Sequence, residues 1–466
     1  MMTHDTPLPI GWRVSAAFLH SSLTWRVNTR AEPTMIQSQS LQLTKIFLSS
    51  TIWAHGHHHG APFAFGRQHY SYEVARRKFA TALHHLGLEI HDVPRPEIYA
   101  APVSRQFLSG NCCHLIFKPT EWIRLLKGVK NIACVAWEFD RLIAPDTRSS
   151  SHPFKDMRRM LMLPDEVWTP CEFTRQVFQA NGIRNVHRIP APISVPSAPV
   201  PIQFPEIPPD LDRVSWINLR VGFGRYRDLN RSVPSRPYRL SDIILDYYQG
   251  RQPQIFVSVL NPHDLRKNLT SLIGGFLEFH AENPNSLLLL KLIVDNTSDR
   301  LDNVLTGILT LRISQYELID SNGIWLTTAN LPEPVLGDLY RFSSAYVCTS
   351  LAEGQNLPLQ EAMAWGLVPI TTRHTAMVDY ISDSNAVVIS SRRSPIERPD
   401  TAMGSEPDAT WHVCTSADVA RGLRSFAALG EARRLELGSR ARATIARHFS
   451  VEPVARLIQA RLMQQP

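Results

Sequence analysis

A strand–turn–helix–strand pattern within residues 345–371 constrains the fold of this chain more than any other feature. Residues 345–349 are apolar enough for a buried strand, and Pro358 suits the first turn of a helix, where its missing N–H costs no hydrogen bond. Gly366 is a typical residue after the last helical turn, and residues 367–371 predict the next strand. A strand, a helix and a strand in this order predict a parallel α/β sheet.

Two glutamates lie on either side of the predicted turn. Glu353 belongs to the loop after the first strand, and Glu361 lies about one turn into the helix, with seven residues between them. Ligands of open α/β sheets bind in the crevice at the carboxyl ends of the strands, so we expect both carboxylates to face that crevice. Carboxylates there accept hydrogen bonds from the hydroxyl groups of a sugar or a ribose.

The spacing of these glutamates, followed by Ala-Met-Ala-Trp-Gly, resembles the signature of the retaining glycosyltransferases of family 4 (glycosyl transferases group 1). Residues 336–345, 165–173 and 189–190 also resemble segments of that family. The resemblance implies an α/β fold of the GT-B type, with two Rossmann-like domains facing across a cleft. It implies that Glu353 contacts the donor sugar and that Glu361 binds the ribose hydroxyls of the nucleotide.

A basic tripeptide, Arg266-Lys267-Asn268, precedes the helix predicted from residue 269. A lysine near a helix N-terminus adds its charge to free backbone N–H groups and favours an anion. Lys267 matches the family's phosphate-contacting lysine, so we predict that Lys267 and Glu353 are catalytic.

The sequence departs from the family pattern in two places. Leu260-Asn261 stands where the family usually has Gly-Arg, and we hypothesise that Arg266 replaces the missing arginine. The family's Glu-Gly-Phe-Gly is changed after Gly354, but asparagine tolerates the left-handed backbone that the turn needs. Besides Glu361 and Arg266, we predict donor contacts from loop residues Gly354, Gln355, Asn356, Leu357 and His374.

The first half of the chain offers candidates for the acceptor side. Trp137 and Glu138 follow the apolar strand predicted at residues 131–136, and an aromatic and an acidic side chain there can stack on and hydrogen-bond a sugar. Gly60 ends a loop with four histidines, which by the resemblance borders the cleft. These histidines lack carboxylate or cysteine partners at ligand spacing, so we predict no metal site.

The order of apolar runs predicts five regions. Strands are expected at 43–50, 88–93, 131–136 and 186–189, and in a second series at 255–260, 287–294, 323–327, 345–349, 367–371 and 386–390. The predicted regions are an N-terminal extension that we expect to be poorly ordered (1–42), an acceptor domain (43–195), a Pro-rich linker or insertion (196–252), a nucleotide-sugar domain (253–445) and a C-terminal helix that crosses back (446–466). The Asp210-Leu-Asp212 triplet lies in the linker rather than after a strand, so we do not assign it to a metal.

Length and charge exclude some classes of function. A chain of 466 residues is long enough for two cores, and its net charge of +7 is modest and lacks a basic block with interleaved aromatics. We therefore expect no nucleic-acid partner. Six cysteines without a Cys-x-x-Cys pair indicate reduced thiols, and no apolar run is long enough to span a bilayer. We expect a cytoplasmic protein, with peripheral membrane contact as a hypothesis and both Met1 and Met35 as candidate starts.

These features together predict a metal-independent, hexosyltransferase-type enzyme with no cofactor. Its partners would be a nucleotide-sugar donor and a glycan or lipid-linked acceptor, as in polysaccharide biosynthesis. Two alternatives stay open. One is another GT-B enzyme, such as a sugar-nucleotide epimerase or a glycogen-synthase-like polymerase. The other is a catalytically weak glycan-binding or partner protein, which the changed turn and the missing arginine motivate.

Overall fold

The computed structural model describes residues 43–50, 68–98, 111–143, 153–197, 200–219, 237–294, 323–396 and 408–463. The extension predicted at 1–42, the histidine loop and Gly60 lie outside the described residues.

The N-terminal lobe contains a six-stranded parallel sheet in the order β2-β1-β3-β4-β5-β6. Apolar side chains on its faces form two buried clusters, one of which lies under helix α1. The strands are β1 (Leu43–Ser50), β2 (Glu89–Asp92), β3 (Asn111–Phe117), β4 (Lys130–Cys134), β5 (Glu166–Thr169) and β6 (Val186–Arg188), and the helices are α1 (Gln68–His85), α3 (Met157–Leu161) and α4 (Glu172–Ala180).

The C-terminal lobe contains a seven-stranded sheet in the order β13-β12-β11-β8-β9-β10-β7, parallel except for β7. Its near-continuous apolar strands are typical of a sheet that is covered on both faces. Its strands are β7 (Ile217–Asn218), β8 (Gln254–Leu260), β9 (Ser286–Leu292), β10 (Ile324–Thr327), β11 (Ala345–Cys348), β12 (Val368–Thr371) and β13 (Val387–Val388), and its helices are α8 (Leu269–Glu282), α10 (Glu333–Phe342), α11 (Leu357–Ala364), α12 (Ser416–Ala427) and α13 (Glu431–His448).

The strand order reverses next to β8. From β8 the chain moves outward through β9 and β10, and then returns to place β11 on the other side of β8. The two helices that follow β8 and β11 therefore begin beside each other at the carboxyl edge of the sheet. Such a reversal is where open α/β sheets bind their ligands.

Among its described residues, the Pro-rich segment carries two short helices, α5 (Pro209–Asp212) and α7 (Leu240–Tyr248). Asp212 accepts hydrogen bonds from the backbone N–H and the hydroxyl of Ser241 at the start of α7. Asp210 pairs with Arg213 on the exposed surface at 3.0 Å. Both aspartates of the Asp-x-Asp triplet thus have local structural partners.

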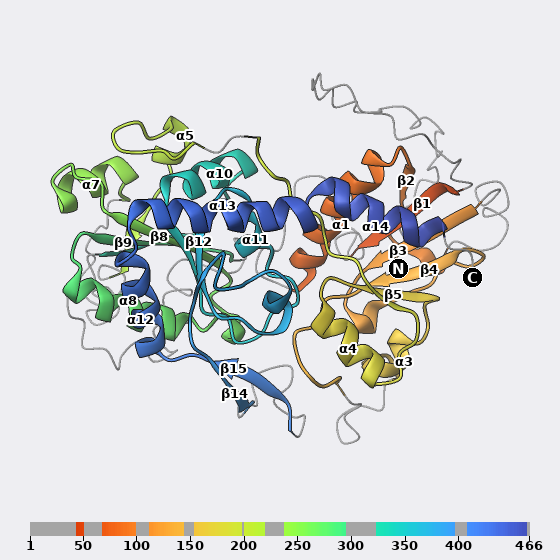
Figure 1. Ribbon diagram of the computed structural model, residues 1–466. Helices are drawn as coiled ribbons and strands as arrows, with labels where there is room; N and C mark the ends of the chain where they lie inside the picture. Colours follow the sequence, from red (N-terminus) through yellow and green to blue (C-terminus); the bar gives the residue numbers. More distant parts are fainter. Residues whose placement is uncertain are drawn as a thin grey trace, which may run out of the picture. The chain divides into compact units, whose positions relative to one another are not determined.

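The last helix, α14 (Val451–Met463), returns to the N-terminal lobe, as the resemblance implies (Figure 1). Val454 and Ile458 are fully buried in the core under α1. Arg461 pairs with the buried carboxylate of Glu166 on β5 at 2.6 Å. Removing α14 would therefore expose part of the N-terminal core.

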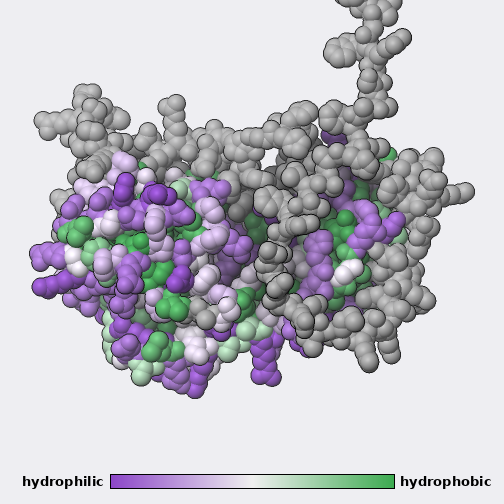
Figure 2. All heavy atoms as spheres, turned by 90° about the horizontal axis from the view of Figure 1, so that it is seen from above, coloured by the Kyte–Doolittle hydropathy of each residue, from purple (hydrophilic) through white to green (hydrophobic). Residues whose placement is uncertain are grey.

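Outside the lobes' sheets, β14 (Arg392–Pro395) and β15 (Thr410–Val413) form an antiparallel pair. On the face shown in Figure 2, most of the coloured surface is hydrophilic, interrupted by small apolar patches. No helix among the described residues combines the length and apolar character that crossing a bilayer requires. All six cysteines are buried with free thiols.

Candidate active site

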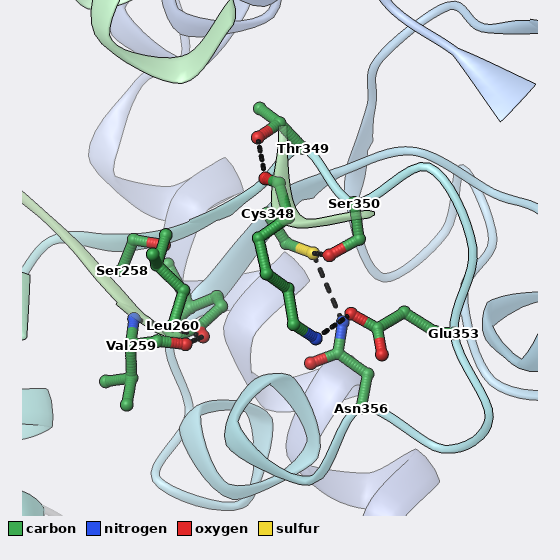
Figure 3. Close-up of a pocket in the computed structure, with 10 residues that line it drawn as sticks. Ser258, Val259, Leu260, Cys348, Thr349, Ser350, Glu353 and Asn356 are labelled. Carbon is green, nitrogen blue, oxygen red and sulfur yellow. Dashed lines mark hydrogen bonds and ion pairs between the residues drawn. The ribbon is translucent and has the colours of Figure 1, made fainter. Parts of the chain in front are cut away.

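A small pocket lies at the reversal of strand order in the C-terminal lobe (Figure 3). It is bounded by the carboxyl ends of β8 and β11 and by the loops that follow them. Its lining residues are Ser258, Val259, Leu260, Lys267, Tyr346, Cys348, Thr349, Ser350, Glu353 and Asn356.

The turn after β11 brings Glu353 and Asn356 to the same side of this pocket (Figure 3). Asn356 has a φ of 65° and a ψ of 64°, so the predicted left-handed turn is confirmed. Its side-chain oxygen accepts a hydrogen bond from the N–H of Leu359 at 3.4 Å and caps α11. Pro358 lies in the first turn of α11, also as predicted. Helix α11 therefore begins at the pocket wall.

Lys267 forms the charged contact of the pocket. Its ammonium Nζ lies 2.6 Å from Oε1 of Glu353, and both side chains are largely buried. Burial opposes the charged form of the lysine, but the carboxylates of Glu353 and Asp264 outweigh burial and raise the pKa of Lys267. The lysine is thus held as a cation.

Backbone contacts fix the two loops against each other. The N–H of Leu351 donates to the carbonyl of Arg266 at 2.6 Å, and the hydroxyl of Thr349 donates to the carbonyl of Lys267 at 3.0 Å. Tyr346 adds a bond between the strands, because its hydroxyl donates to the carbonyl of Val259 at 3.1 Å. The Lys267–Glu353 pair is therefore positioned by a preorganised frame.

Arg266 is engaged with two carboxylates. Its guanidinium bonds Asp264 at 2.7 Å and Glu138 of the N-terminal lobe at 2.8 Å. Burial lowers the pKa of Arg266, but Glu138 and Asp264 outweigh it and raise the pKa above its ordinary value. Arg266 is therefore charged, and it links the two lobes in this structure; its donor-binding role stays a prediction.

The residues at the place of the missing arginine carry no charge. Leu260 is buried and lines the pocket. The side-chain oxygen of Asn261 accepts a hydrogen bond from the N–H of His263 at 2.9 Å and closes the turn before Asp264.

Glu361 does not line the pocket. Its Oε1 lies 2.7 Å from the ammonium of Lys78 on α1, and the two side chains are 25% and 17% exposed. The structure therefore places the two signature glutamates in different surroundings, one in the pocket and one against the N-terminal lobe. The role of Glu361 toward ribose stays a prediction.

The residues between the glutamates pack against the N-terminal lobe. A Cβ added to Gly354 would lie 3.0 Å from Cβ of Ala136 and 3.5 Å from the backbone nitrogen of Trp137, so a larger residue would press on that segment. The amide of Gln355 bonds both the N–H and the carbonyl of Ala191. Leu357 packs against the cores of both lobes. Gly354, Gln355 and Leu357 thus join the lobes beside the pocket.

His374 is buried beside this turn and stacks on His412, with 4.6 Å between the ring centroids. Burial and the neighbouring His412 lower the pKa of His374 to about 3. A neutral imidazole can donate or accept a hydrogen bond with a ligand, but it carries no positive charge to pair with a phosphate. His374 does not line the pocket.

The acceptor candidates after β4 also have protein partners. The indole N–H of Trp137 donates to the carbonyl of Arg141 at 2.8 Å, and its ring packs against Phe139. Glu138 is the carboxylate that pairs with Arg266. Their predicted acceptor roles are therefore not addressed by the contacts of this structure.

Several lining residues were not predicted from the sequence: Ser258, Val259, Tyr346, Cys348, Thr349 and Ser350. They lie at or just after the carboxyl ends of strands that were predicted. Because ligands of open α/β sheets bind at these strand ends, the predicted strands could have identified them. Among the described residues, no group of three or more His, Cys, Asp or Glu side chains could hold a metal ion.

Comparison with known proteins identifies the architecture. Trehalose-6-phosphate synthase OtsA superposes with a TM-score of 0.54 at 9% identity, covering 91% of this chain and 99% of that chain. A glycosyltransferase from Rickettsia africae superposes with a TM-score of 0.53 at 12% identity, covering 91% and 98%. An E. coli structure described as trehalose-6-phosphate and bound with UDP-2-fluoro glucose gives 0.53 at 11% identity, covering 91% and 100%.

The fold is GT-B. The predicted α/β architecture with two Rossmann-like lobes is therefore confirmed. No protein family model matches the sequence, and no curated protein matches it. The chain spans about half the length of S. aureus TarM: it covers 55% of that chain, with a TM-score of 0.47.

Proposed function

We propose that this protein is a retaining glycosyltransferase of the family 4 type, which transfers a hexose from a nucleotide-sugar donor to a glycan or lipid-linked glycan. The Lys267–Glu353 pair carries the proposal. It places a cation and a carboxylate that can accept hydrogen bonds from hydroxyl groups in one pocket, where the strand order reverses. The GT-B fold and the UDP-2-fluoro glucose bound to the E. coli neighbour support a nucleotide-sugar donor.

The pocket suits the two ends of such a donor. The diphosphate would lie against Lys267 and the N-terminus of α11, where a fixed positive charge and the positive end of the helix dipole favour an anion. Glu353 would accept hydrogen bonds from sugar hydroxyls. The ammonium of Lys267 would then donate hydrogen bonds to both the phosphate and Glu353.

The transfer step breaks the bond between the anomeric carbon and the phosphate oxygen. The electron pair goes to the diphosphate, whose growing charge Lys267 stabilises. The acceptor oxygen attacks from the face that the diphosphate leaves, and its proton passes to the leaving phosphate. No covalent protein intermediate and no metal take part in this scheme.

The contacts between the lobes would exclude water during this step. Gly354 packs against residues 136–138 and Gln355 bonds Ala191, so the turn carrying Glu353 is covered on the side of the N-terminal lobe. Water exclusion suppresses hydrolysis of the donor and strengthens the charge interactions in the pocket.

The test is incubation of the purified protein with UDP-, GDP-, ADP- and dTDP-sugars, with and without lipid-linked glycan acceptors and with EDTA. We expect acceptor-dependent release of a nucleoside diphosphate that EDTA does not abolish, a product anomer that NMR shows to be retained, and loss of release in Glu353→Gln. Binding of glycans without release by the wild type would instead indicate a partner protein, and isomerised donor without transfer would indicate an epimerase.

The location follows the proposed acceptor. A lipid-linked acceptor would be met at the cytoplasmic face of a membrane by a peripheral protein. Co-flotation with liposomes that contain the acceptor lipid, compared with liposomes that lack it, tests this part separately.

A further inference from the structure

Lys291 is a buried lysine in the C-terminal sheet that the proposed reaction does not use. It belongs to β9 and is 7% exposed. It is paired in register with Val259 of β8, which lines the pocket, and with Thr327 of β10. Lys291 therefore lies one strand away from the pocket wall.

Side-chain alternation places Lys291 on the same face of the sheet as the pocket residue Val259. Leu287 and Leu289, four and two residues before it, belong to the same core cluster as Val259, whereas Leu288 and Leu290 belong to the cluster on the opposite face. Tyr346 and Cys348 of the pocket also belong to the first cluster. Lys291 thus shares a face with three pocket residues.

The ammonium of Lys291 makes few polar contacts for a buried cation. It donates to the carbonyl of Leu292 at 3.2 Å, and no carboxylate of a described residue forms an ion pair with it. Burial lowers its pKa to about 8. Buried polar groups normally have their hydrogen bonds satisfied, so a lysine in this state calls for a reason.

The charge balance at the pocket supplies that reason. Lys267 is paired with Glu353, and Arg266 is paired with Asp264 and Glu138, so these two cations meet three carboxylates. Leu260-Asn261 adds no positive charge. A diphosphate placed against this set would meet no excess of positive charge, whereas a positive potential favours binding of an anion.

We propose that Lys291 supplies the unpaired cation for the phosphates of the nucleotide donor, beside Lys267. This inference rests on the proposed function. Neighbouring strands lie about 4.7–4.9 Å apart, so a lysine stem on β9 can bring its ammonium to the carboxyl end of β8 by rotating away from Leu292. The unfavourable environment of Lys291 is then relieved when the phosphate binds.

The test measures nucleotide affinity by isothermal titration calorimetry. UDP, GDP, ADP, CDP and dTDP are titrated into the wild type, and the tightest of them is then compared with its nucleoside, whose affinity is measured by ligand-observed NMR. The variants are Lys291→Met, which removes the charge, and Lys291→Arg, which keeps it. Lys118→Met is the matched control, because Lys118 is a buried lysine of the N-terminal lobe that also donates to one backbone carbonyl, that of Pro94 at 3.3 Å.

We expect Lys291→Met to weaken diphosphate binding by about 10- to 150-fold while nucleoside binding is unchanged. Lys291→Arg should recover part of the affinity, and Lys118→Met should retain it. Circular dichroism and thermal unfolding confirm that each variant is folded.

An unchanged diphosphate affinity in Lys291→Met would overturn the assignment of Lys291 and leave the proposed function standing. An equal loss for the nucleoside would also overturn it, because the contact would then be to the base or ribose. If the wild type binds none of the diphosphates, the proposed function itself fails, and this inference fails with it.

Discussion

The carboxyl edges of the two sheets use buried carboxylates in opposite ways. At the N-terminal sheet, Glu73 of α1 accepts hydrogen bonds from Ser50, from two nitrogens of Arg76 and from Arg77, all between 2.7 and 3.0 Å. At the C-terminal sheet, Glu353 pairs with Lys267 and borders a small pocket.

The difference separates a structural charge from a functional one. The carboxylate of Glu73 has its acceptor positions filled by protein donors and holds α1 against β1. Glu353 instead makes one side-chain ion pair, borders the pocket and can accept further hydrogen bonds from a ligand. Among buried carboxylates, therefore, the remaining hydrogen-bonding capacity and the adjacent volume indicate function better than burial alone.

The largest effect expected is on stability, at Glu73. Glu73→Ala leaves Arg76 without its principal partner inside the lobe, and breaking such a buried pair costs about 3–5 kcal/mol in the free energy of unfolding. Urea denaturation measures this loss. The control is Glu436→Ala, because Glu436 pairs with arginines on the exposed surface, where the change in the free energy of unfolding should be small. A Glu73 variant as stable as the wild type would remove the contrast between the two edges.

The next largest effect is on the turnover number, at Lys267. Lys267→Met removes the cation that stabilises the leaving diphosphate, and we expect kcat to fall on the order of 10²- to 10³-fold. Steady-state kinetics of nucleoside diphosphate release, with thermal unfolding as the fold control, measure it. A variant with normal kcat and raised KM would show that Lys267 only helps binding.

A smaller effect is expected on nucleotide affinity, at Glu361. If this carboxylate binds the ribose, Glu361→Ala should weaken nucleotide binding by about 10- to 150-fold. Lys78→Met is the matched variant, because it removes the other half of the ion pair and leaves the carboxylate free for the ligand. We expect its nucleotide affinity to be retained or increased. Equal behaviour of the two variants, with affinity unchanged in both, would assign Glu361 to the interface between the lobes.

The smallest effect is a pH-dependent gain of stability in Lys291→Met. Burial lowers the pKa of Lys291 from 10.5 to about 8, so the folded protein holds this proton less tightly than the unfolded chain does. The resulting penalty is fully present below about pH 8 and is relieved as the pH rises toward 10.5. Below pH 8, Lys291→Met should therefore unfold at a higher urea concentration than the wild type, with a free energy of unfolding larger by on the order of 1–3 kcal/mol. This gain in stability should shrink above pH 8. A loss of stability at every pH would mean that the ammonium stabilises the fold.

The sequence predicts the strands that are uniformly apolar. The C-terminal helix is predicted within 446–466 and runs from Val451 to Met463 in the structure. Strands β8, β9 and β11 are predicted to within about two residues, because apolar runs mark buried parallel strands. Strand β3 is missed because His114 interrupts its apolar run. In the structure this His is buried and bonds Asn131 and Ser49, partners that lie far away in the sequence.

The site is predicted where local spacing determines it. The Asn356 turn and the helix that begins beside it follow from residue types within one short segment. The pairing of Lys267 with Glu353 joins residues 86 positions apart, and only the strand order brings them together. The contacts of Glu361, Gln355 and Arg266 with the N-terminal lobe depend on how loops of two sheets meet, which no local pattern encodes.

The most direct test of the account is a crystal structure of the protein with the nucleoside diphosphate that binds it most tightly. We predict that the phosphates lie at the N-terminus of α11, within hydrogen-bonding distance of the ammonium of Lys267. A nucleotide ordered elsewhere on the protein, with the Lys267–Glu353 pocket empty, would contradict the central claim.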